Sequence, residues 1–291
     1  MLKLAIAGSG MIVKEFLPHF KATGWEVCAI CGTKRSEEVV KELCRIYGGK
    51  PYCDYEKMLA EIDCDAVYIG VPNHLHYDFA KKALLAGKNV ILEKPMTVND
   101  AETKELYAIA KDKDVFLLEA ITTLYLPVYE KVREWLSLIG KVRIVSSNYS
   151  QYSSRYDRFK QGIIEPVFDV SKAGGALGDL NIYNIHFIAG LFSGRKPEVN
   201  YLANVVKGVD TSGILTMDYG DFKAVAIGAK DCAAPVSTTV QGDLGYIKLV
   251  GPPNVCKEAE LCLNNGKIFY KFLNENLIFV ISKQNKKNLL L

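Results

Sequence analysis

The sequence of 291 residues contains no apolar run near the roughly 18 residues that a membrane-spanning helix requires. Its net charge is only +3, too small to indicate binding to nucleic acid or to an anionic membrane. It also contains no low-complexity linker and no internal repeat. The apolar and charged fractions are ordinary for a globular protein, so we expect large cores and no partner among nucleic acids or membranes.

Signals for export are also missing. The apolar stretch Leu2–Ala7 is too short for a signal peptide and is better interpreted as a first strand. The eight cysteines are therefore expected to be reduced thiols of a cytoplasmic protein. Cys28 and Cys31 have the spacing of a metal or redox pair, but they lie in an apolar strand with no second pair nearby. We expect them to pack in the core, and we predict no metal site.

The first 120 residues alternate strand and helix patterns. Strands are expected at 2–7, 25–30, 66–71, 89–92 and 115–118, and helices around Phe16 and at 37–47, 55–61, 76–86 and 100–111, with Asp100 as the cap of the last. The face of the first helix is expected to carry Ile12, Phe16, Leu17 and Phe20. This alternation predicts a doubly wound parallel sheet with right-handed crossovers, an α/β domain over residues 1–120.

From residue 121 to 291 the rhythm changes to alternating apolar and polar residues. Strands are expected at 142–152, 198–206, 214–219, 222–230, 246–250, 260–263, 268–272 and 277–281, with helices at 129–138 and 178–192. Such a pattern is typical of an open antiparallel sheet with helices on one face. The second domain is therefore expected to be α+β.

The stretch Val90–Met96 places charged residues at the end of a buried strand. Pro95 cannot donate to a ladder and pushes Lys94 toward an extended backbone, so the strand stops there. Glu93 and Lys94 then lie at the carboxyl edge of the sheet, where ligands bind in open α/β folds. A lysine at this edge is a candidate catalytic group, because its pKa shifts readily on burial. The alternative is a surface ion pair that caps the strand.

Gly8-Ser9-Gly10 lies between the first strand and the first helix. Here the first glycine would make the tight turn, and the second would let a pyrophosphate approach the amino end of the helix. The residues expected to line this dinucleotide site are Gly8, Ser9, Gly10, Met11 and Ile12. Val13 replaces the usual third glycine, so we expect a slightly wider gap between helix and strand. A glycine turn without a ligand is the alternative.

The second strand ends without the acidic residue that binds the ribose hydroxyls of NAD. Thr33, Lys34 and Arg35 follow it and could hold a ribose phosphate instead. We therefore expect NADP or NAD as cofactor, with NADP favoured. The alternative is that Lys34 and Arg35 are solvated loop charges.

Several segments in this order resemble the glucose–fructose oxidoreductase / inositol dehydrogenase / MocA family. They are Ala5–Gly10, Asp65–Asn73, His76 with Ala80 and Ala83, Ala86–Lys88, Glu93–Pro95 and Gly174–Asp179. The resemblance implies a Rossmann domain followed by an α+β domain whose sheet forms a homodimer or homotetramer. It also implies hydride transfer between a nicotinamide and a sugar, polyol, diol or related carbonyl substrate. Relatives usually run tens of residues longer and return a helix to the first domain.

The resemblance assigns roles to individual residues. Lys94 matches the active-site lysine, and Val71, Pro72, Asn73, His76 and Glu93 are expected beside the cofactor. A tyrosine, Tyr183, stands where many relatives have a histidine, as in the branch similar to dimeric dihydrodiol dehydrogenase. In that branch the tyrosine is the proposed proton donor.

Asp179, Tyr183 and His186 recur at spacings of four and three, so one helical face should carry all three. We expect Tyr183 to act as general acid and base, Lys94 as its electrostatic partner and Asp179 as the orienting group. His186 is a candidate for substrate contact. Without the resemblance, the favoured interpretation is that Tyr183 and His186 are core residues with satisfied polar tips.

Arg155, after a strand of the second domain, could bind an anionic or polyhydroxy substrate, or it could be a solvated loop charge. The sequence thus favours an NAD(P)-dependent dehydrogenase or reductase. Two alternatives remain: a non-catalytic NAD(P)-binding sensor, and a lyase or glycosidase that uses tightly bound NAD.

Overall fold

The computed structural model describes residues 1–20, 23–264 and 269–273. These residues form two compact units, the first ending at Ala120 and the second beginning at Ile121. Among the described residues, no helix has both the length and the apolar character needed to cross a bilayer.

The first unit contains a six-stranded sheet in which every neighbouring pair is parallel. The strands are β1 (Leu2–Ala7), β2 (Trp25–Cys31), β3 (Lys50–Tyr52), β4 (Ala66–Ile69), β5 (Asn89–Leu92) and β6 (Leu117–Glu119). Their order, β3-β2-β1-β4-β5-β6, reverses direction between β1 and β4. The predicted parallel sheet is confirmed, and the reversal point is where such folds bind ligands.

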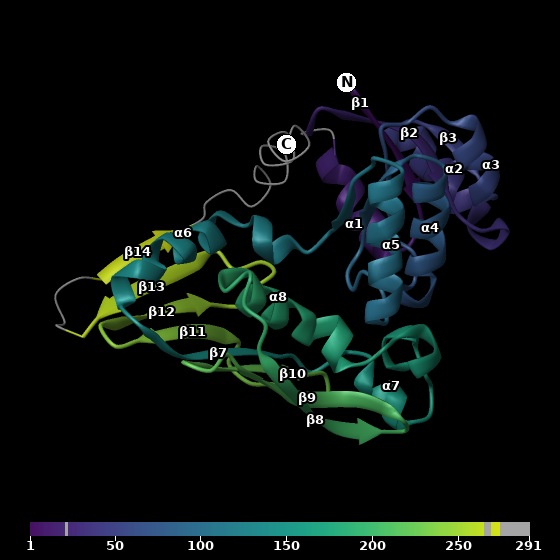
Figure 1. Cartoon of the computed structure of the whole chain (residues 1–291). Coiled ribbons are helices and arrows are strands. Elements are labelled where there is room, and N and C mark those ends of the chain that lie inside the picture. Colours follow the sequence, from purple (N-terminus) through teal and green to yellow (C-terminus); the bar gives the residue numbers. More distant parts are fainter. Residues whose placement is uncertain (21–22, 265–268, 274–291) are drawn as a thin grey trace. The chain divides into compact units, whose positions relative to one another are not determined.

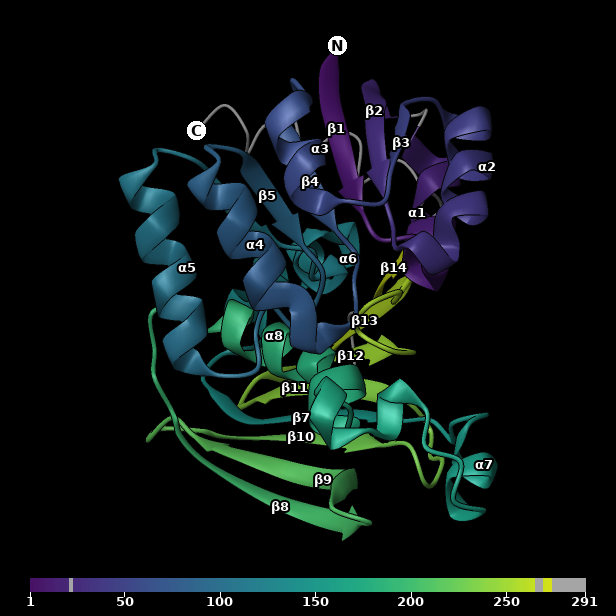
Figure 2. The ribbon, with the colours of Figure 1, turned by 90° about the vertical axis from the view of Figure 1, so that its right-hand side faces the viewer.

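Five helices cover this sheet on both faces. They are α1 (Met11–Phe20), α2 (Glu37–Tyr47), α3 (Tyr55–Glu61), α4 (His76–Leu85) and α5 (Asp100–Asp112). One apolar cluster joins α1 and α2 to one face, and a second joins α3, α4 and α5 to the other. Helices α4 and α5 pack against each other and lie side by side (Figure 2). Because helices cover both faces of the sheet, the inner strands are largely buried on both faces, and their sequences are near-continuous apolar runs.

Two local predictions in this unit were wrong. Ile12 was expected on the buried face of α1, but it is exposed, and the buried residues of this helix are Val13, Leu17 and Phe20. The cap of α5 is Asn99, whose side chain accepts from the N–H of Glu102 at 2.9 Å, and Asp100 is the first helical residue. Asparagine and aspartate are both good caps, so the sequence alone could not separate adjacent candidates.

The second unit contains an eight-stranded sheet. Its strands are β7 (Val142–Ser150), β8 (Glu198–Val206), β9 (Val209–Asp218), β10 (Lys223–Ala229), β11 (Ser237–Gly242), β12 (Gly245–Val250), β13 (Glu258–Leu263) and β14 (Phe269–Leu273). The order is β14-β13-β12-β11-β7-β10-β9-β8. All pairs are antiparallel except β7 with β10, which the long intervening segment allows to be parallel. The strand predicted at 277–281 lies outside the described residues.

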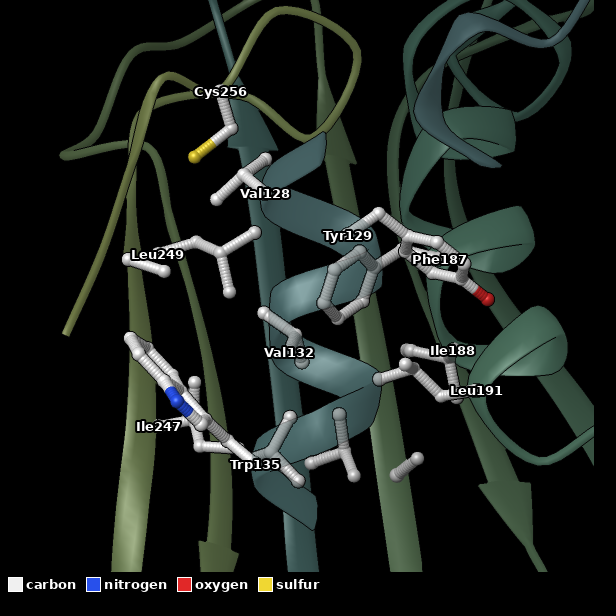
Figure 3. Packing of buried hydrophobic residues seen from close by; sticks show 14 of the residues in the cluster. Val128, Tyr129, Val132, Trp135, Phe187, Ile188, Leu191, Ile247, Leu249 and Cys256 are labelled. Atoms are coloured by element: carbon white, nitrogen blue, oxygen red, sulfur yellow. The ribbon is translucent and has the colours of Figure 1, made fainter. Parts of the chain in front are cut away.

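Helices α6 (Pro127–Trp135) and α8 (Ile182–Leu191) both lie over one face of this sheet (Figure 1). The core between them is apolar and tightly packed, with Val132 of α6 and Ile188 of α8 fully buried (Figure 3). The ring of Tyr129 meets that of Phe187 edge-on, with centroids 5.6 Å apart. A short helix, α7 (Tyr156–Lys160), follows β7 and was not predicted. The α+β character of the unit is therefore confirmed.

Candidate functional site

The glycine loop after β1 is shaped by Gly8, whose φ is +122°. A Cβ on Gly8 would lie 2.3 Å from the carbonyl oxygen of Gly70, closer than any side chain tolerates. The Gly8 N–H donates to the Cys31 carbonyl at 2.8 Å, and the Gly70 N–H donates to the Ala7 carbonyl at 2.8 Å. The carboxyl end of β1 is thus fixed between β2 and β4, at the point where the strand order reverses.

Gly10 has a different environment. A Cβ placed there would meet nothing within 4 Å, so the space before the first turn of α1 is open. The N–H groups of that turn have no helical partners of their own, and the positive end of the helix dipole favours an anion. The arrangement suits the close approach of a pyrophosphate group.

Val13 fills the place of the third glycine and is fully buried. Its Cγ2 would lie 3.0 Å from a Cβ on Gly70, so the missing side chain of Gly70 makes the room that Val13 occupies. Helix α1 therefore packs closely on the sheet because Gly70, directly after β4, has no side chain. A third glycine in α1 is not needed for this contact.

The loop after β2 is held by Thr33 and Ser36, which bracket a short 3-10 turn, η2 (Lys34–Ser36). The Thr33 N–H donates to the Ser36 hydroxyl at 3.0 Å, and the Ser36 N–H donates to the Thr33 carbonyl at 2.9 Å. Lys34 and Arg35 are exposed and form no ion pair with any described residue. This loop adjoins the glycine loop, since a Cβ on Gly32 would lie 3.3 Å from the Ser9 hydroxyl.

His76 links the loops after β4 and β5. It follows Val71, Pro72 and a 3-10 turn, η3 (Asn73–Leu75), and its side chain is buried. Its Nδ1 lies 2.7 Å from the Pro95 carbonyl and its Nε2 lies 2.9 Å from the Val71 carbonyl. Burial lowers the pKa of His76 despite these two acceptors. A neutral imidazole has one N–H, so it donates to one of these two carbonyls, and His76 lies between the loops after β4 and β5.

Glu93 and Lys94 lie just beyond β5, as predicted. The Tyr68 hydroxyl donates to Glu93 Oε1 at 2.7 Å, and the Lys94 N–H donates to Glu93 Oε2 at 3.2 Å. Burial raises the pKa of Glu93. The Lys94–Pro95 peptide bond is cis, and the Met96 N–H donates to Glu119 Oε1 at 2.9 Å. The Glu93 carboxylate is therefore held at the sheet edge by two hydrogen bonds.

In the second unit, a π-helical segment (Leu177–Asn181) leads directly into α8. Residues facing the sheet are buried: Asn181, Asn184, Phe187, Ile188 and Leu191. Asp179, Tyr183 and His186 are half-buried. The Tyr149 ring of β7 lies near that of Tyr183, with centroids 6.1 Å apart. Tyr183 and His186 belong to α8, whereas Asp179 lies in the π-helical segment before it, so a shared helical face for all three stays a prediction.

A fully buried polar network anchors this helix to the sheet. The Ser147 hydroxyl of β7 donates to Asn184 Oδ1 at 2.7 Å and lies 2.6 Å from the Thr238 hydroxyl of β11. The Asn184 amide donates to Asn181 Oδ1 and to the Ile227 carbonyl, both at 2.9 Å. The Asn181 amide donates to the Ala226 carbonyl of β10 at 3.0 Å. Because each amide group is bonded, the network fixes the register of the helix that carries Asp179 and Tyr183.

Asp179 has a partner that sequence reasoning missed. Lys230, directly after β10, donates from Nζ to Asp179 Oδ2 at 2.7 Å, although its side chain is only 3% exposed. A signal was present: Ala224, Ala226 and Gly228 are the buried, alternate positions of β10, and the same period of two assigns Lys230 to the helix-covered face.

Arg155 forms an ion pair within its own unit. Its Nε lies 2.9 Å from Glu165 Oε2, and Arg158 lies 2.9 Å from the other oxygen of the same carboxylate. The guanidinium is therefore neither a freely solvated charge nor an uncommitted anion site.

No group of described side chains has the composition of a metal site. All eight cysteines are free thiols; Cys31 is buried and Cys28 half-buried. The structure thus presents two sets of chemical groups. A glycine loop, a basic loop and Lys94 belong to the first unit, and Asp179 with Tyr183 belongs to the second.

Comparison with known proteins gives concordant results. The sequence model described as an oxidoreductase family with an NAD-binding Rossmann fold matches residues 2–121. The chain is 32% identical to scyllo-inositol 2-dehydrogenase (NADP(+)) of Bacillus subtilis, over 85% of this chain and 75% of that protein. It is 30% identical to trans-1,2-dihydrobenzene-1,2-diol dehydrogenase of Xenopus laevis, over 91% of this chain and 79% of that protein.

Solved structures share the fold. A 3-ketoreductase from Actinomadura kijaniata, in complex with NADP and TDP-benzene, superposes with a TM-score of 0.86 at 22% identity, covering 99% of this chain and 90% of the other. Levoglucosan dehydrogenase, in complex with NADH and levoglucosan, gives 0.82 at 20% identity, covering 94% and 80%. With the curated relatives, these matches show that the chain is an NAD(P)-binding oxidoreductase and belongs to the glucose–fructose oxidoreductase / inositol dehydrogenase / MocA family.

Proposed function

We propose that this oxidoreductase is an NADP-dependent dehydrogenase or reductase that interconverts a secondary alcohol and a ketone on a sugar, polyol or cyclic diol. The observation that carries the proposal is the presentation of Asp179 and Tyr183. Both side chains are half-buried, on a helical segment that a bonded network of buried amides holds against the sheet. The relatives named for inositol and for a benzene dihydrodiol share a vicinal diol in their substrates, which agrees with this class.

The residues divide the chemistry. The first turn of α1 and Gly10 would hold the pyrophosphate, and the bound nicotinamide would supply or accept the hydride. Tyr183 would give its phenolic proton to the carbonyl oxygen during reduction and take it back during oxidation. Lys94 would favour the phenolate and polarise the carbonyl, since a nearby ammonium stabilises negative charge. Asp179 would orient a neighbouring substrate hydroxyl, and His186 would contact the substrate.

The test of this proposal compares two tyrosines. Tyr183→Phe should lower kcat by roughly 100-fold or more, because proton transfer is lost while the ring is retained. Its affinity for NADPH, measured by fluorescence titration, should stay within about twofold. Tyr149→Phe removes the hydroxyl of the adjacent ring and serves as the matched variant, with turnover expected to remain within a few fold. Near-normal turnover of Tyr183→Phe on the preferred substrate would remove Tyr183 from the mechanism.

We further propose that NADP is preferred to NAD. Lys34 and Arg35 are exposed beside the glycine loop, and the loop after β2 offers no acidic residue to the ribose hydroxyls. Arg35→Ser should weaken NADPH binding about tenfold and leave NADH binding unchanged, because only NADPH carries the phosphate. Arg45→Ser is the matched control, since Arg45 is already paired with Glu42 at 2.7 Å. Equal losses for both cofactors would contradict the preference.

A homodimer or homotetramer through the open sheet face also belongs to the proposal. Alternation places exposed apolar side chains on the face opposite α6 and α8, among them Ile144, Leu202, Ile214, Tyr246 and Val250. Ile214→Lys should lower the mass measured by light scattering toward that of one chain, whereas an unchanged mass would exclude this face. We place the protein in the cytoplasm, where its eight free thiols would stay reduced.

A further inference from the structure

Strand β10 runs directly beneath the segment that carries Asp179. A Cβ on Gly228 would lie 2.6 Å from the Cβ of Asn181, so the strand and the π-helical segment are in close contact. Two residues further along the strand, on the same face, comes Lys230. Its backbone is fixed, since its N–H donates to the Thr211 carbonyl at 2.8 Å and its carbonyl accepts from the Ser153 N–H at 2.9 Å.

The ammonium of Lys230 is held on three sides. Its Nζ donates to Asp179 Oδ2 at 2.7 Å and to the Val167 carbonyl at 2.9 Å. It also lies over the Phe168 ring, 4.6 Å from the centroid. These contacts leave the lysine almost no freedom, and they fix the position of one oxygen of the carboxylate.

The two members of the ion pair differ in exposure. The Lys230 side chain is 3% exposed, whereas the Asp179 side chain is 32% exposed. A lysine buried only for stability would be a poor choice, because a buried ion pair is often replaced by apolar side chains without loss. Here the buried partner reaches out of the core to a carboxylate that opens toward solvent. A buried lysine can hold the Asp179 carboxylate in place while the carboxylate remains accessible to a substrate.

Asp179 is therefore attached to β10 twice. The main chain of its segment is bound through the Asn181 amide to the Ala226 carbonyl, and its own side chain is bound to Lys230. The two attachment points are four residues apart on one strand, so both the segment and the rotamer of Asp179 are set by β10.

We propose that Lys230 is a positioning residue that fixes the rotamer and the negative charge of Asp179, so that the carboxylate is preorganised to orient a substrate hydroxyl. The inference rests on the proposed function of Asp179. In this proposal Lys230, whose side chain is only 3% exposed, acts through the carboxylate.

The central variant is Lys230→Met, which keeps the length of the side chain and removes its charge. We expect KM for the substrate to rise at least tenfold and kcat to fall several fold, because the carboxylate is no longer held. The Kd for NADPH, whose expected site lies in the other unit, should stay within twofold. A parallel loss of NADPH affinity or an unchanged kcat/KM would overturn the proposal.

A double-mutant cycle separates positioning from a general effect on the fold. In an Asp179→Asn background, Lys230→Met should cause no further loss of kcat/KM, because its only route of action is gone. This double variant also leaves no unpaired buried charge, so it is expected to fold even if Lys230→Met alone does not. Lys230→Arg should restore part of the activity. A full additional loss in the Asp179→Asn background would overturn the proposal.

Lys207 provides the matched control. Its Nζ donates to the Phe159 carbonyl at 2.7 Å and lies 5.1 Å from the centroid of the Phe159 ring, so it has the same kinds of contact without the carboxylate. Lys207→Met should leave kcat/KM within twofold. A loss equal to that of Lys230→Met would show that the ring and carbonyl contacts matter, and would overturn the assignment.

A crystal structure of the Lys230→Met variant gives a readout that needs no substrate. The Asp179 carboxylate should leave its present position, and an unmoved carboxylate would overturn the proposal. If the wild-type protein turned over no alcohol or ketone, the proposed function would fail, and the position of the carboxylate would decide the role of Lys230 separately.

Discussion

The two glycines of the loop after β1 should respond to the same substitution in opposite ways. Gly8 has a φ of +122°, and a Cβ there would lie 2.3 Å from the Gly70 carbonyl oxygen. Strain of a non-glycine residue in this region costs about 1–3 kcal/mol, and forced overpacking costs about 1–3 kcal/mol more. Gly8→Ala should therefore destabilise the first unit by about 2–6 kcal/mol, because neither the backbone of β4 nor the turn can give way.

Gly10→Ala adds the same methyl group to open space. Its stability should change by less than about 1 kcal/mol, and a small gain is expected because alanine restricts the unfolded chain. The methyl group would, however, stand where the pyrophosphate must approach the backbone. The Kd for NADPH should rise at least tenfold, a loss of about 1.4 kcal/mol.

Urea unfolding followed by far-ultraviolet circular dichroism measures the first quantity, and quenching of intrinsic fluorescence by NADPH measures the second. The reasoning is refuted if Gly8→Ala unfolds at the same urea concentration as the wild type. It is equally refuted if Gly10→Ala binds NADPH with unchanged affinity, since the open space would then have another purpose.

Three further substitutions test the supports of the site by urea unfolding. Asn184→Ala should cost about 2–4 kcal/mol, because it removes the amide that donates to Asn181 Oδ1 and to the Ile227 carbonyl inside the core; a cost below 0.5 kcal/mol would contradict this. Burial lowers the pKa of His76, so on acidification the imidazole takes up a proton in the unfolded chain before it does so in the folded protein. The free energy of unfolding of the wild type, measured relative to that of His76→Gln, should therefore be constant above about pH 7. It should fall as the pH drops below about 6.5. Burial raises the pKa of Glu93, so the wild type loses stability as the pH rises above about 4.5, where this carboxyl ionises in the unfolded chain. The free energy of unfolding of Glu93→Gln, measured relative to that of the wild type, should therefore increase from about pH 4.5 toward neutrality.

Most of the strands and helices followed from periodicity. Strand β3 (Lys50–Tyr52) has only three residues and contains Pro51, which is tolerated because the strand lies at the sheet edge. Strand β11 (Ser237–Gly242) is mostly polar, and it is held as a strand by its ladders to β7 and β12. Both were missed because their pairing partners, rather than their own side chains, determine their structure.

The site was predicted less completely, and the reason is geometric. The spacing of Asp179, Tyr183 and His186 is a local property of one short segment, and it can be read from the sequence. The partners of these groups come from distant segments: Lys230 is 51 residues beyond Asp179. Arg155 has its partner, Glu165, in a loop that no periodicity describes. A pattern along the chain can therefore nominate a charged side chain, but the folded structure is needed to show which charge compensates it.

The glycine motif illustrates the same point within a single loop. A motif with Val13 in place of its third glycine predicts a looser contact between helix and strand if the loop is considered alone. The structure shows that Gly70, 57 residues away in sequence, omits the side chain instead, and the Cγ2 of Val13 occupies the space. What the fold requires is one missing side chain between helix α1 and the sheet, and either partner can omit it. Gly70→Ala should therefore destabilise the first unit, and Gly70→Ala combined with Val13→Gly should recover part of the lost stability in urea unfolding. A double variant no more stable than Gly70→Ala alone would show that Gly70 is needed for another reason.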